Sequence, residues 1–186
     1  MKLTLLPPIM SALRPRFSIR NELLHKHQDT LPGSWLPVLR DAMSGKAEMF
    51  RWGLAESKMN GDDRLVFATK IENLLTRNGR SMLERRLIVP VESFELSSEG
   101  RSFRLRSTNL KPMALAALWD IDGHWRGRPV RAFRLITGPT LDGFEALGPR
   151  MPIVLCPSNE RAWLWHFTEE DAALDALEPY TALQFD

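Results

Sequence analysis

Side chains that could bind a metal or act as a nucleophile are few and scattered in this sequence. The chain has four histidines and a single cysteine, Cys156. His25 and His27 are two residues apart, so on a helix they would point to different faces, and no CxxC or HExxH motif accompanies them. There is also no GxGxxG, Walker-type or GxSxG motif. We therefore expect neither a metal site nor a cofactor, and we interpret Cys156 as a small core residue.

Basic side chains outnumber acidic ones over most of the chain. All 25 lysines and arginines lie within residues 1–161, which hold 17 acidic residues, whereas the last 25 residues hold six acids and no base. Arginines alternate with apolar residues around 101–106 and 126–134, a spacing that would gather guanidinium groups on one face of a strand. Such a face suits the phosphates of a nucleic acid. The alternative is the solvated outer face of half-buried strands.

Five short segments resemble motifs of the SOS-response-associated peptidase family, and they occur in the family's order. The segments are LPGSWLPVLR at 31–40 (APG…PVLR in the family), FRWGL at 50–54 (RWGL), RRLIVP at 85–90 (RRCLIP), AALW at 116–119 (AGLW) and RMP at 150–152 (HxRMP). Together they extend over roughly residues 31–165. Each is short, and their order and spacing make the resemblance specific.

The resemblance implies a function on DNA. Family members use a cysteine that is exposed when the initiator methionine is removed. Its thiol and α-amine together close a thiazolidine ring on the aldehyde of an abasic site in single-stranded DNA, assisted by an asparagine, a glutamate and a histidine. Single-stranded or abasic DNA is therefore the implied partner of this chain.

Three positions of this chain depart from the family pattern. Lys2 stands where the cysteine would follow the methionine, and a second match, RPRFS at 14–18 against CGRFS, places Arg14 there instead. The family's NAR tripeptide aligns with FAT at 67–69, and the histidine of HxRMP aligns with Gly148. Cys156 cannot replace the nucleophile because an internal residue has no free α-amine. The sequence predicts that the family's chemistry is absent here.

Five residues are predicted to form what remains of the site. Glu95 and Thr137 are the catalytic candidates, and Arg150, Trp52 and Arg16 are the DNA-binding ones, all by resemblance. The family's GFYEW element corresponds to SFEL at 93–96, which is one residue shorter. Glu95 therefore takes either the glutamate or the tyrosine position of that element, and its side chain points either into the site or to solvent. For the others a structural role is the alternative: a strand threonine, an arginine paired with an acid, a core tryptophan.

Short strands and few helices are expected to position these residues. Turn residues bound apolar runs at 36–40, 49–54, 87–96, 102–106, 113–119, 130–137 and 153–155. Helices are expected at 18–27, at 71–77 and after a capping Thr168, and a polar loop at 55–65. This pattern predicts an α+β fold with a curved, mostly antiparallel, barrel-like sheet and flanking short helices.

The whole chain is expected to form one domain, 1–186, with a divergent N-terminal arm and helix at 1–30 and an acidic C-terminal helix and tail at 166–186. No apolar run is long enough to span a membrane, and Pro7 and Pro8 interrupt the apolar start, which argues against a secretion signal. A single cysteine excludes an internal disulfide and fits a reducing compartment. We expect a cytoplasmic monomer that contacts neither a membrane nor a metal.

Three functions are compatible with these features. The favoured one is an inactive relative that binds single-stranded or damaged DNA non-covalently, in a DNA-damage-response or mobile-element context. A second is an active abasic-site cross-linking or peptidase-type enzyme, with Glu95 as acid–base and Lys2 or Lys70 forming a Schiff base. A third is a protein-interaction module that has lost DNA contact. The retained arginine and tryptophan positions favour the first over the third.

Overall fold

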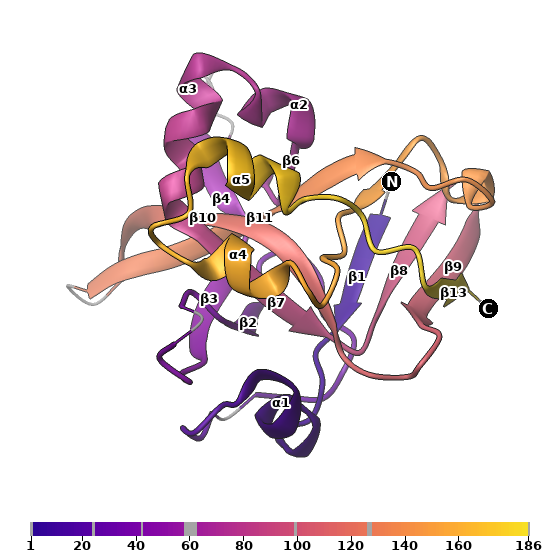
Figure 1. The fold of residues 1–186 in the computed structure, drawn as a ribbon, viewed down its shortest axis with the longest axis horizontal. Coiled ribbons are helices and arrows are strands. Elements are labelled where there is room, and N and C mark those ends of the chain that lie inside the picture. Colours follow the sequence, from indigo (N-terminus) through magenta and orange to yellow (C-terminus); the bar gives the residue numbers. More distant parts are fainter. Residues whose placement is uncertain are drawn as a thin grey trace.

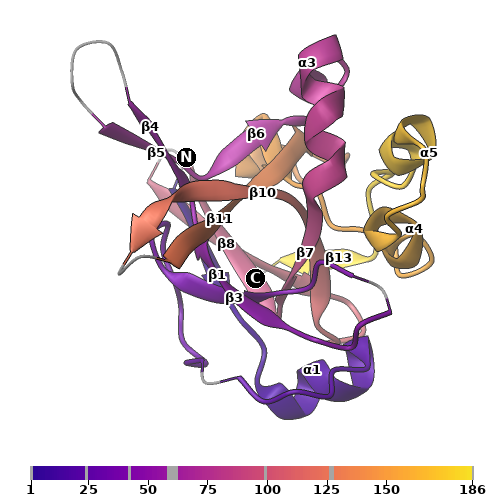
Figure 2. The same ribbon diagram turned by 90° about the vertical axis from the view of Figure 1, so that its left-hand side faces the viewer.

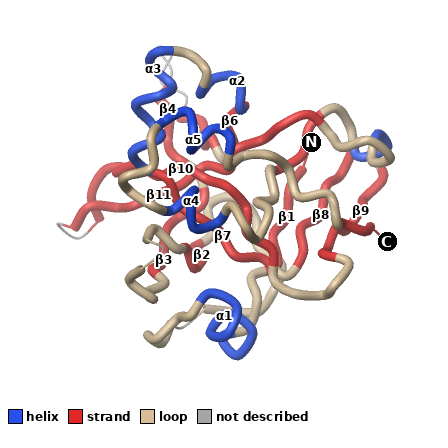
Figure 3. The backbone as a smooth tube through the Cα atoms, in the orientation of Figure 1, coloured by secondary structure: helices blue, strands red, loops and turns tan. Residues whose placement is uncertain are grey.

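A computed structural model describes residues 2–23, 25–41, 43–57, 63–98, 100–125 and 128–185. Figure 1 shows its elements, and Figure 3 shows strands in the interior with helices around them. The strands are β1 (Lys2–Leu6), β2 (Trp35–Val38), β3 (Glu48–Trp52), β4 (Leu54–Ser57), β5 (Asp63–Val66), β6 (Ala68–Lys70), β7 (Arg86–Val91), β8 (Ser93–Ser98), β9 (Arg101–Ser107), β10 (Met113–Trp125), β11 (Arg128–Pro139), β12 (Arg150–Pro152) and β13 (Leu183–Phe185). The helices are α1 (Met10–Phe17), α2 (Ile71–Leu74), α3 (Arg77–Arg80), α4 (Glu160–Leu164) and α5 (Glu170–Asp175), with 3₁₀ turns η1 (Ser81–Arg85) and η2 (Glu145–Leu147).

Two sheets curve around a common interior and make a nearly closed barrel (Figure 2). The larger has the order β2-β3-β11-β10-β7, with β6 and β12 also pairing with β11, and the smaller has the order β1-β8-β9-β13. All pairs are antiparallel except those of β11 with β3 and β6. Leu39 and Ile88 exchange backbone hydrogen bonds of 2.9 and 2.8 Å, which connects the two ends of the larger sheet. The predicted fold class is confirmed.

Alternation along the strands explains why the larger sheet is buried on both faces. In β7, Leu87 and Val89 belong to the core inside the barrel, whereas Ile88 belongs to a second core between the sheet and the helices. In β10, Leu115 packs inward and Ala116 outward in the same way. Each buried leucine, isoleucine or valine contributes about 1.5–3 kcal/mol to folding. The strongest strand signals in the sequence thus come from strands without a polar face.

The helix expected at 18–27 is not formed by the described residues of that range. The helix lies earlier, as α1, and ends at Ser18, which adopts a left-handed backbone conformation with φ 53°. Asn21 then exchanges two side-chain hydrogen bonds with the backbone of Ala47. His25 bonds the carbonyl of Pro8. These side chain–backbone bonds hold the segment extended, a competition with helix formation that residue spacing does not reveal.

Three further elements differ from the expectations. The polar stretch 55–65 contributes to a hairpin of β4 and β5, and its residues 58–62 lie outside the described part of the chain. The helix expected at 71–77 is split into α2 and α3. The final helix exists as α5, but Thr168 donates to the carbonyl of Ala162 instead of capping it.

Both ends of the chain contribute strands to the smaller sheet. β1 pairs with β8, so part of the segment 1–30 that we expected to be an arm is a barrel strand. β13 pairs with β9, so the tail within 166–186 is also part of the sheet. Among the described residues, no helix has the length and apolar character needed to cross a bilayer.

Candidate functional site

A cleft lined by three cationic side chains lies where β5 and β6 meet the turn before β12. Its volume is about 420 Å³, and Arg64, Lys70 and Arg150 line it together with Thr137 and Gly148. None of the described residues that line it is acidic. We call this cavity the basic cleft. Its composition suits an anionic ligand with apolar parts.

The end of β11 positions two sides of the basic cleft. Thr137 pairs in parallel register with Lys70 of β6 and in antiparallel register with Pro152 of β12. β6 and β12 therefore lie on opposite edges of β11, and Arg150 begins β12. Lys70 and Arg150 are 80 residues apart in the sequence, yet both lie beside Thr137.

Arg150 is held by a carboxylate and by the backbone. Its Nη1 and Nη2 donate to the two oxygens of Glu72 at 2.8 and 2.6 Å, and Nη2 also donates to the carbonyl of Thr137 at 2.7 Å. The hydrogen bonds from Arg150 lower the pKa of the exposed Glu72 carboxyl to about 2. This bidentate geometry is also the one in which an arginine binds phosphate.

Thr137 is buried, and its hydroxyl is already bonded. The Oγ1 atom donates to the carbonyl of Thr69 at 3.1 Å, and Nε of Arg150 approaches the same oxygen at 3.4 Å. These contacts suit a residue that positions Arg150. The hydroxyl proton is directed at a backbone carbonyl, and the catalytic role of Thr137 stays a prediction.

Trp52 is fully buried, so its indole cannot stack on a base. Its Nε1 donates to the carbonyl of Phe67 at 3.0 Å, and its ring stacks on Phe133 with centroids 6.5 Å apart. Since Phe67 lines the basic cleft, the hydrogen bond from Trp52 helps to fix the position of one lining residue from the core side. The structure favours the core alternative for this residue.

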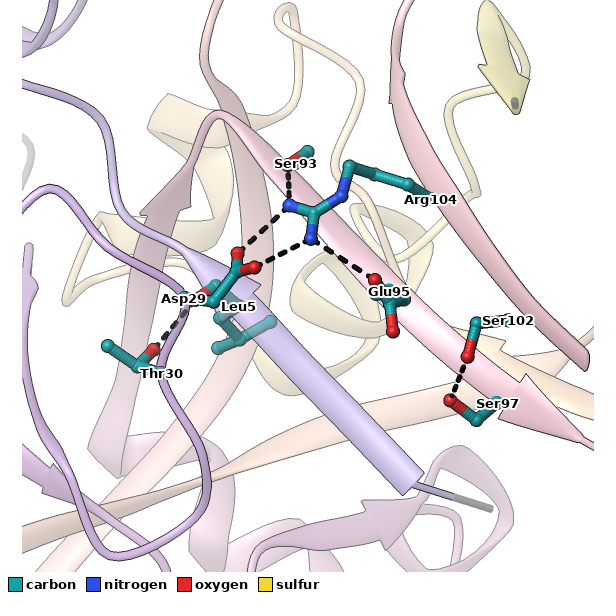
Figure 4. A network of polar contacts seen from close by, with 8 residues as sticks. All are labelled: Leu5, Asp29, Thr30, Ser93, Glu95, Ser97, Ser102 and Arg104. Atoms are coloured by element: carbon teal, nitrogen blue, oxygen red, sulfur yellow. Dashed lines mark hydrogen bonds and ion pairs between the residues drawn. The ribbon is translucent and has the colours of Figure 1, made fainter.

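Glu95 lies on the outer face of β8, away from the basic cleft. Its neighbours Phe94 and Leu96 are fully buried, so Glu95 points the opposite way. Arg104 binds Glu95 at 3.1 Å and pairs with both oxygens of Asp29 (Figure 4). These hydrogen bonds, more than the charge of Arg104, lower the pKa of Asp29. The outward alternative is the one that the structure shows: Arg104 holds Asp29, in the segment before β2, to the smaller sheet, and Glu95 binds Arg104 from the neighbouring strand.

Arg16 also lies outside the basic cleft. It donates to the two oxygens of Glu160 at 2.9 and 2.5 Å, and the two side chains are 21% and 12% exposed. Burial raises the pKa of Glu160, and the hydrogen bond and charge of Arg16 oppose that rise. The geometry assigns Arg16 to the attachment of α1 to α4.

Three of the alternating arginines are paired with acids. Arg104 is paired as described above, Arg131 binds Glu48 at 2.9 Å, and Arg134 lies 3.8 Å from Glu56. For these three, a phosphate would have to displace a carboxylate. The cations of the basic cleft come instead from Arg150, which the resemblance identified, and from Arg64 and Lys70, which flank the segment aligned with the family's NAR tripeptide. The position of Arg64 close to the segment aligned with the NAR tripeptide is the sequence feature that could have identified it as a site residue.

Lys2, the other candidate amine, begins β1, and its side chain lies outside what the structure describes. Gly148 lines the basic cleft at the position aligned with the family's histidine. Cys156 accepts a hydrogen bond from Ser158 at 3.1 Å and is not part of the cleft. Within the described ranges, no three His, Cys, Asp or Glu side chains come together as metal ligands.

Comparisons with known proteins agree in pointing to one family. A family model described as SOS response associated peptidase (SRAP) matches residues 9–186. Abasic site processing protein YoqW of Bacillus subtilis (strain 168) is 26% identical over 160 residues, 79% of this chain and 70% of the relative. Protein YoaM of the same organism, which has the same description, is 23% identical over 158 residues, 79% of this chain and 69% of the relative. A crystal structure from Bordetella bronchiseptica superimposes with a TM-score of 0.81 at 16% identity, covering 100% of this chain and 98% of the other, which shows a shared fold.

Proposed function

The chain belongs to the SOS response associated peptidase family, and we propose that it binds single-stranded or abasic DNA non-covalently in the basic cleft. One observation carries this proposal: Arg64, Lys70 and Arg150 converge on a cavity, and none of the described residues that line it is an acid. The names of the two relatives, both abasic site processing proteins, support abasic DNA as the ligand class.

The charges of the cleft favour phosphate over a neutral ligand. Arg64 and Lys70 have no ion-pair partner within the part of the chain that the structure describes, so a phosphate would not have to displace an acid from them. Arg150 would exchange Glu72 for phosphate without changing its bidentate geometry. Binding is non-covalent in this proposal because the aligned cysteine, asparagine and histidine positions hold other residues.

Fluorescence anisotropy with a labelled single-stranded oligonucleotide at about 50 mM salt tests this function. We expect R64A, K70A and R150A each to weaken binding about tenfold, the loss typical of one charge-assisted hydrogen bond. K111A is the matched control, since Lys111 is an exposed lysine that does not line the basic cleft. Absence of binding by the unaltered protein would rule out the proposal and favour the protein-interaction alternative.

The presence of Lys70 in the cleft supports a second candidate, a reversible Schiff base with the abasic aldehyde. The neutral Nζ would add to C1′ of the ring-opened sugar, its two protons would pass in turn to the former aldehyde oxygen, and that oxygen would leave as water as the C=N bond forms. Glu95 has no part in this candidate because it lies outside the cleft.

A denaturing gel separates the two candidates. Non-covalent binding predicts no shifted band with abasic oligonucleotide, either with or without borohydride. A band that appears only with borohydride, and that K70R but not K111R abolishes, would establish the Schiff base. A band that persists without reductant would contradict the proposal that the family's covalent chemistry is absent.

A further inference from the structure

Trp35 is a large aromatic residue on the surface of the protein. It is 48% exposed, whereas Trp52 and Trp163 are fully buried. It begins β2, which is an edge strand in the order of the larger sheet, and the residues that follow it in β2 are buried. Leu31, four residues earlier, is 46% exposed. Two large apolar side chains are thus exposed within one five-residue segment, where the apolar part of a ligand can pack on them.

Leu65 connects this surface to the basic cleft. Its side chain lines the cleft and packs so closely on Gly53 that a Cβ atom there would lie 2.6 Å from its Cγ. It also reaches within 4.0 Å of a Cβ position at Gly33, two residues before Trp35. Trp35 is directly opposite Arg51 in the pairing of β2 with β3. Apolar surface therefore runs from the wall of the cleft towards Trp35.

We infer that Trp35 is a stacking platform for a base of the DNA strand that leaves the basic cleft. The occupant is an unpaired strand, because only unpaired bases expose their faces to an aromatic side chain. Charge complementarity favours DNA over a protein segment, since the described residues that line the cleft include three cations and no acid. The inference rests on the proposed function and adds a contact that depends on bases, beside contacts that depend on phosphates.

The test compares two probes of equal length and charge: a labelled oligothymidylate, and a chain of the same phosphates carrying abasic analogues without bases. We expect W35A to weaken oligothymidylate binding at least fivefold, because base–aromatic stacking is a substantial part of single-strand affinity. W35A should leave affinity for the base-free chain unchanged within twofold, and W35F should restore most of the affinity for oligothymidylate. The matched control is F167A, which removes an 85% exposed aromatic from the turn between α4 and α5.

Each outcome decides one question. Equal loss on both probes would overturn the inference and make Trp35 structural, a reading that a lowered melting temperature would support. No loss on either probe, while R150A still weakens both, would also overturn it and leave the proposed function intact, with a protein partner as the remaining explanation for the exposed side chain. Failure of the unaltered protein to bind either probe would overturn both.

Discussion

Glu72 occupies the edge of Arg150 that a phosphate would use, so the two anions compete for one guanidinium group. We predict that E72Q strengthens binding of single-stranded DNA about threefold, a modest factor because exposed ion pairs contribute little. Anisotropy measurements check this, with E84Q as the control that removes one exposed acid elsewhere. A loss of affinity in E72Q would show instead that Glu72 orients Arg150 for DNA.

The pH dependence of this competition follows from the lowered pKa of Glu72. A carboxyl whose pKa falls from 4.5 to about 2 in the folded state stabilises the fold above its ordinary pKa and loses that contribution only as the pH falls towards 2. Glu72 is therefore ionised throughout pH 5–8. The effect of E72Q on affinity should be the same at pH 5 and pH 8, and a difference between them would mean that another titrating group controls the cleft.

Arg16 and Glu160 lead to a prediction about stability. Removing Arg16 leaves a largely buried carboxyl unpaired, so we predict that R16A lowers the free energy of unfolding at pH 7 by about 2 kcal/mol. Burial raises the pKa of Glu160, so the folded state holds the proton of this carboxyl more readily than the unfolded state does. The contribution of Glu160 to stability therefore falls as the pH rises past the ordinary pKa of a glutamate. Without Arg16 to oppose the rise, the loss should be larger at pH 7 than at pH 4.

Denaturant unfolding of R16A and of the unaltered protein at both pH values measures this difference. DNA affinity of the folded variant should be unchanged, since Arg16 does not line the basic cleft. R14A is a suitable control, because Arg14 is on the same helix and its ion pair with Glu22 is exposed. Weakened DNA binding with normal stability would return Arg16 to the role that the family resemblance implied.

At the scale of elements, the packing of α3 on α2 determines the position of Glu72, which lies in α2, just after Lys70 of the basic cleft. Gly79 of α3 is buried against the backbone of α2, and a Cβ atom at this position would lie 1.8 Å from the carbonyl oxygen of Asn73. Thr76 caps α3 by accepting a hydrogen bond from the Gly79 amide at 3.1 Å. The close backbone approach means that only glycine fits without moving α2.

We predict that G79A lowers the free energy of unfolding by about 1–3 kcal/mol, the usual effect of overpacking. It should also weaken DNA binding, because a shift of α2 moves Glu72 and its partner Arg150. N78A, at an exposed position of the same helix, is the control for both measurements. Thermal melting and anisotropy provide the readouts, and a G79A protein as stable as the unaltered one would contradict the packing argument.

The strands were predictable from sequence to the extent that their side chains alternate between two cores. The runs at 87–96, 113–119 and 130–137 correspond to β7 with β8, to β10 and to β11, because apolar residues on both faces leave a continuous signal. The pairing of β11 with β6 could not be read from the sequence, since β6 has three residues. The convergence of Lys70 and Arg150 on the cleft depends on that pairing and was therefore not predictable.

At the scale of the whole molecule, part of the excess of basic residues is used in ion pairs with acids. Residues 1–161 have 25 bases and 17 acids, and the sequence alone favoured several phosphate contacts along the alternating arginines. The structure pairs Arg104, Arg131 and Arg134 with acids. These three arginines are engaged with acids, whereas Arg64 and Lys70 of the basic cleft have no ion-pair partner within the described part of the chain.

The number of cations at the basic cleft determines the salt dependence that we expect for DNA binding. If the three cations of the cleft each contact one phosphate, the logarithm of affinity for a single strand should fall with the logarithm of salt concentration with a slope of about −2. Affinity would then drop about twentyfold between about 50 and 200 mM salt. Anisotropy titrations at four salt concentrations measure the slope, and K70A should reduce its magnitude by about 0.7, whereas K111A should not change it. A slope steeper than about −4 would mean that arginines outside the cleft also contact DNA. The ion pairs of Arg104, Arg131 and Arg134 argue against such contacts, because each phosphate would have to replace a carboxylate already bound to the guanidinium group.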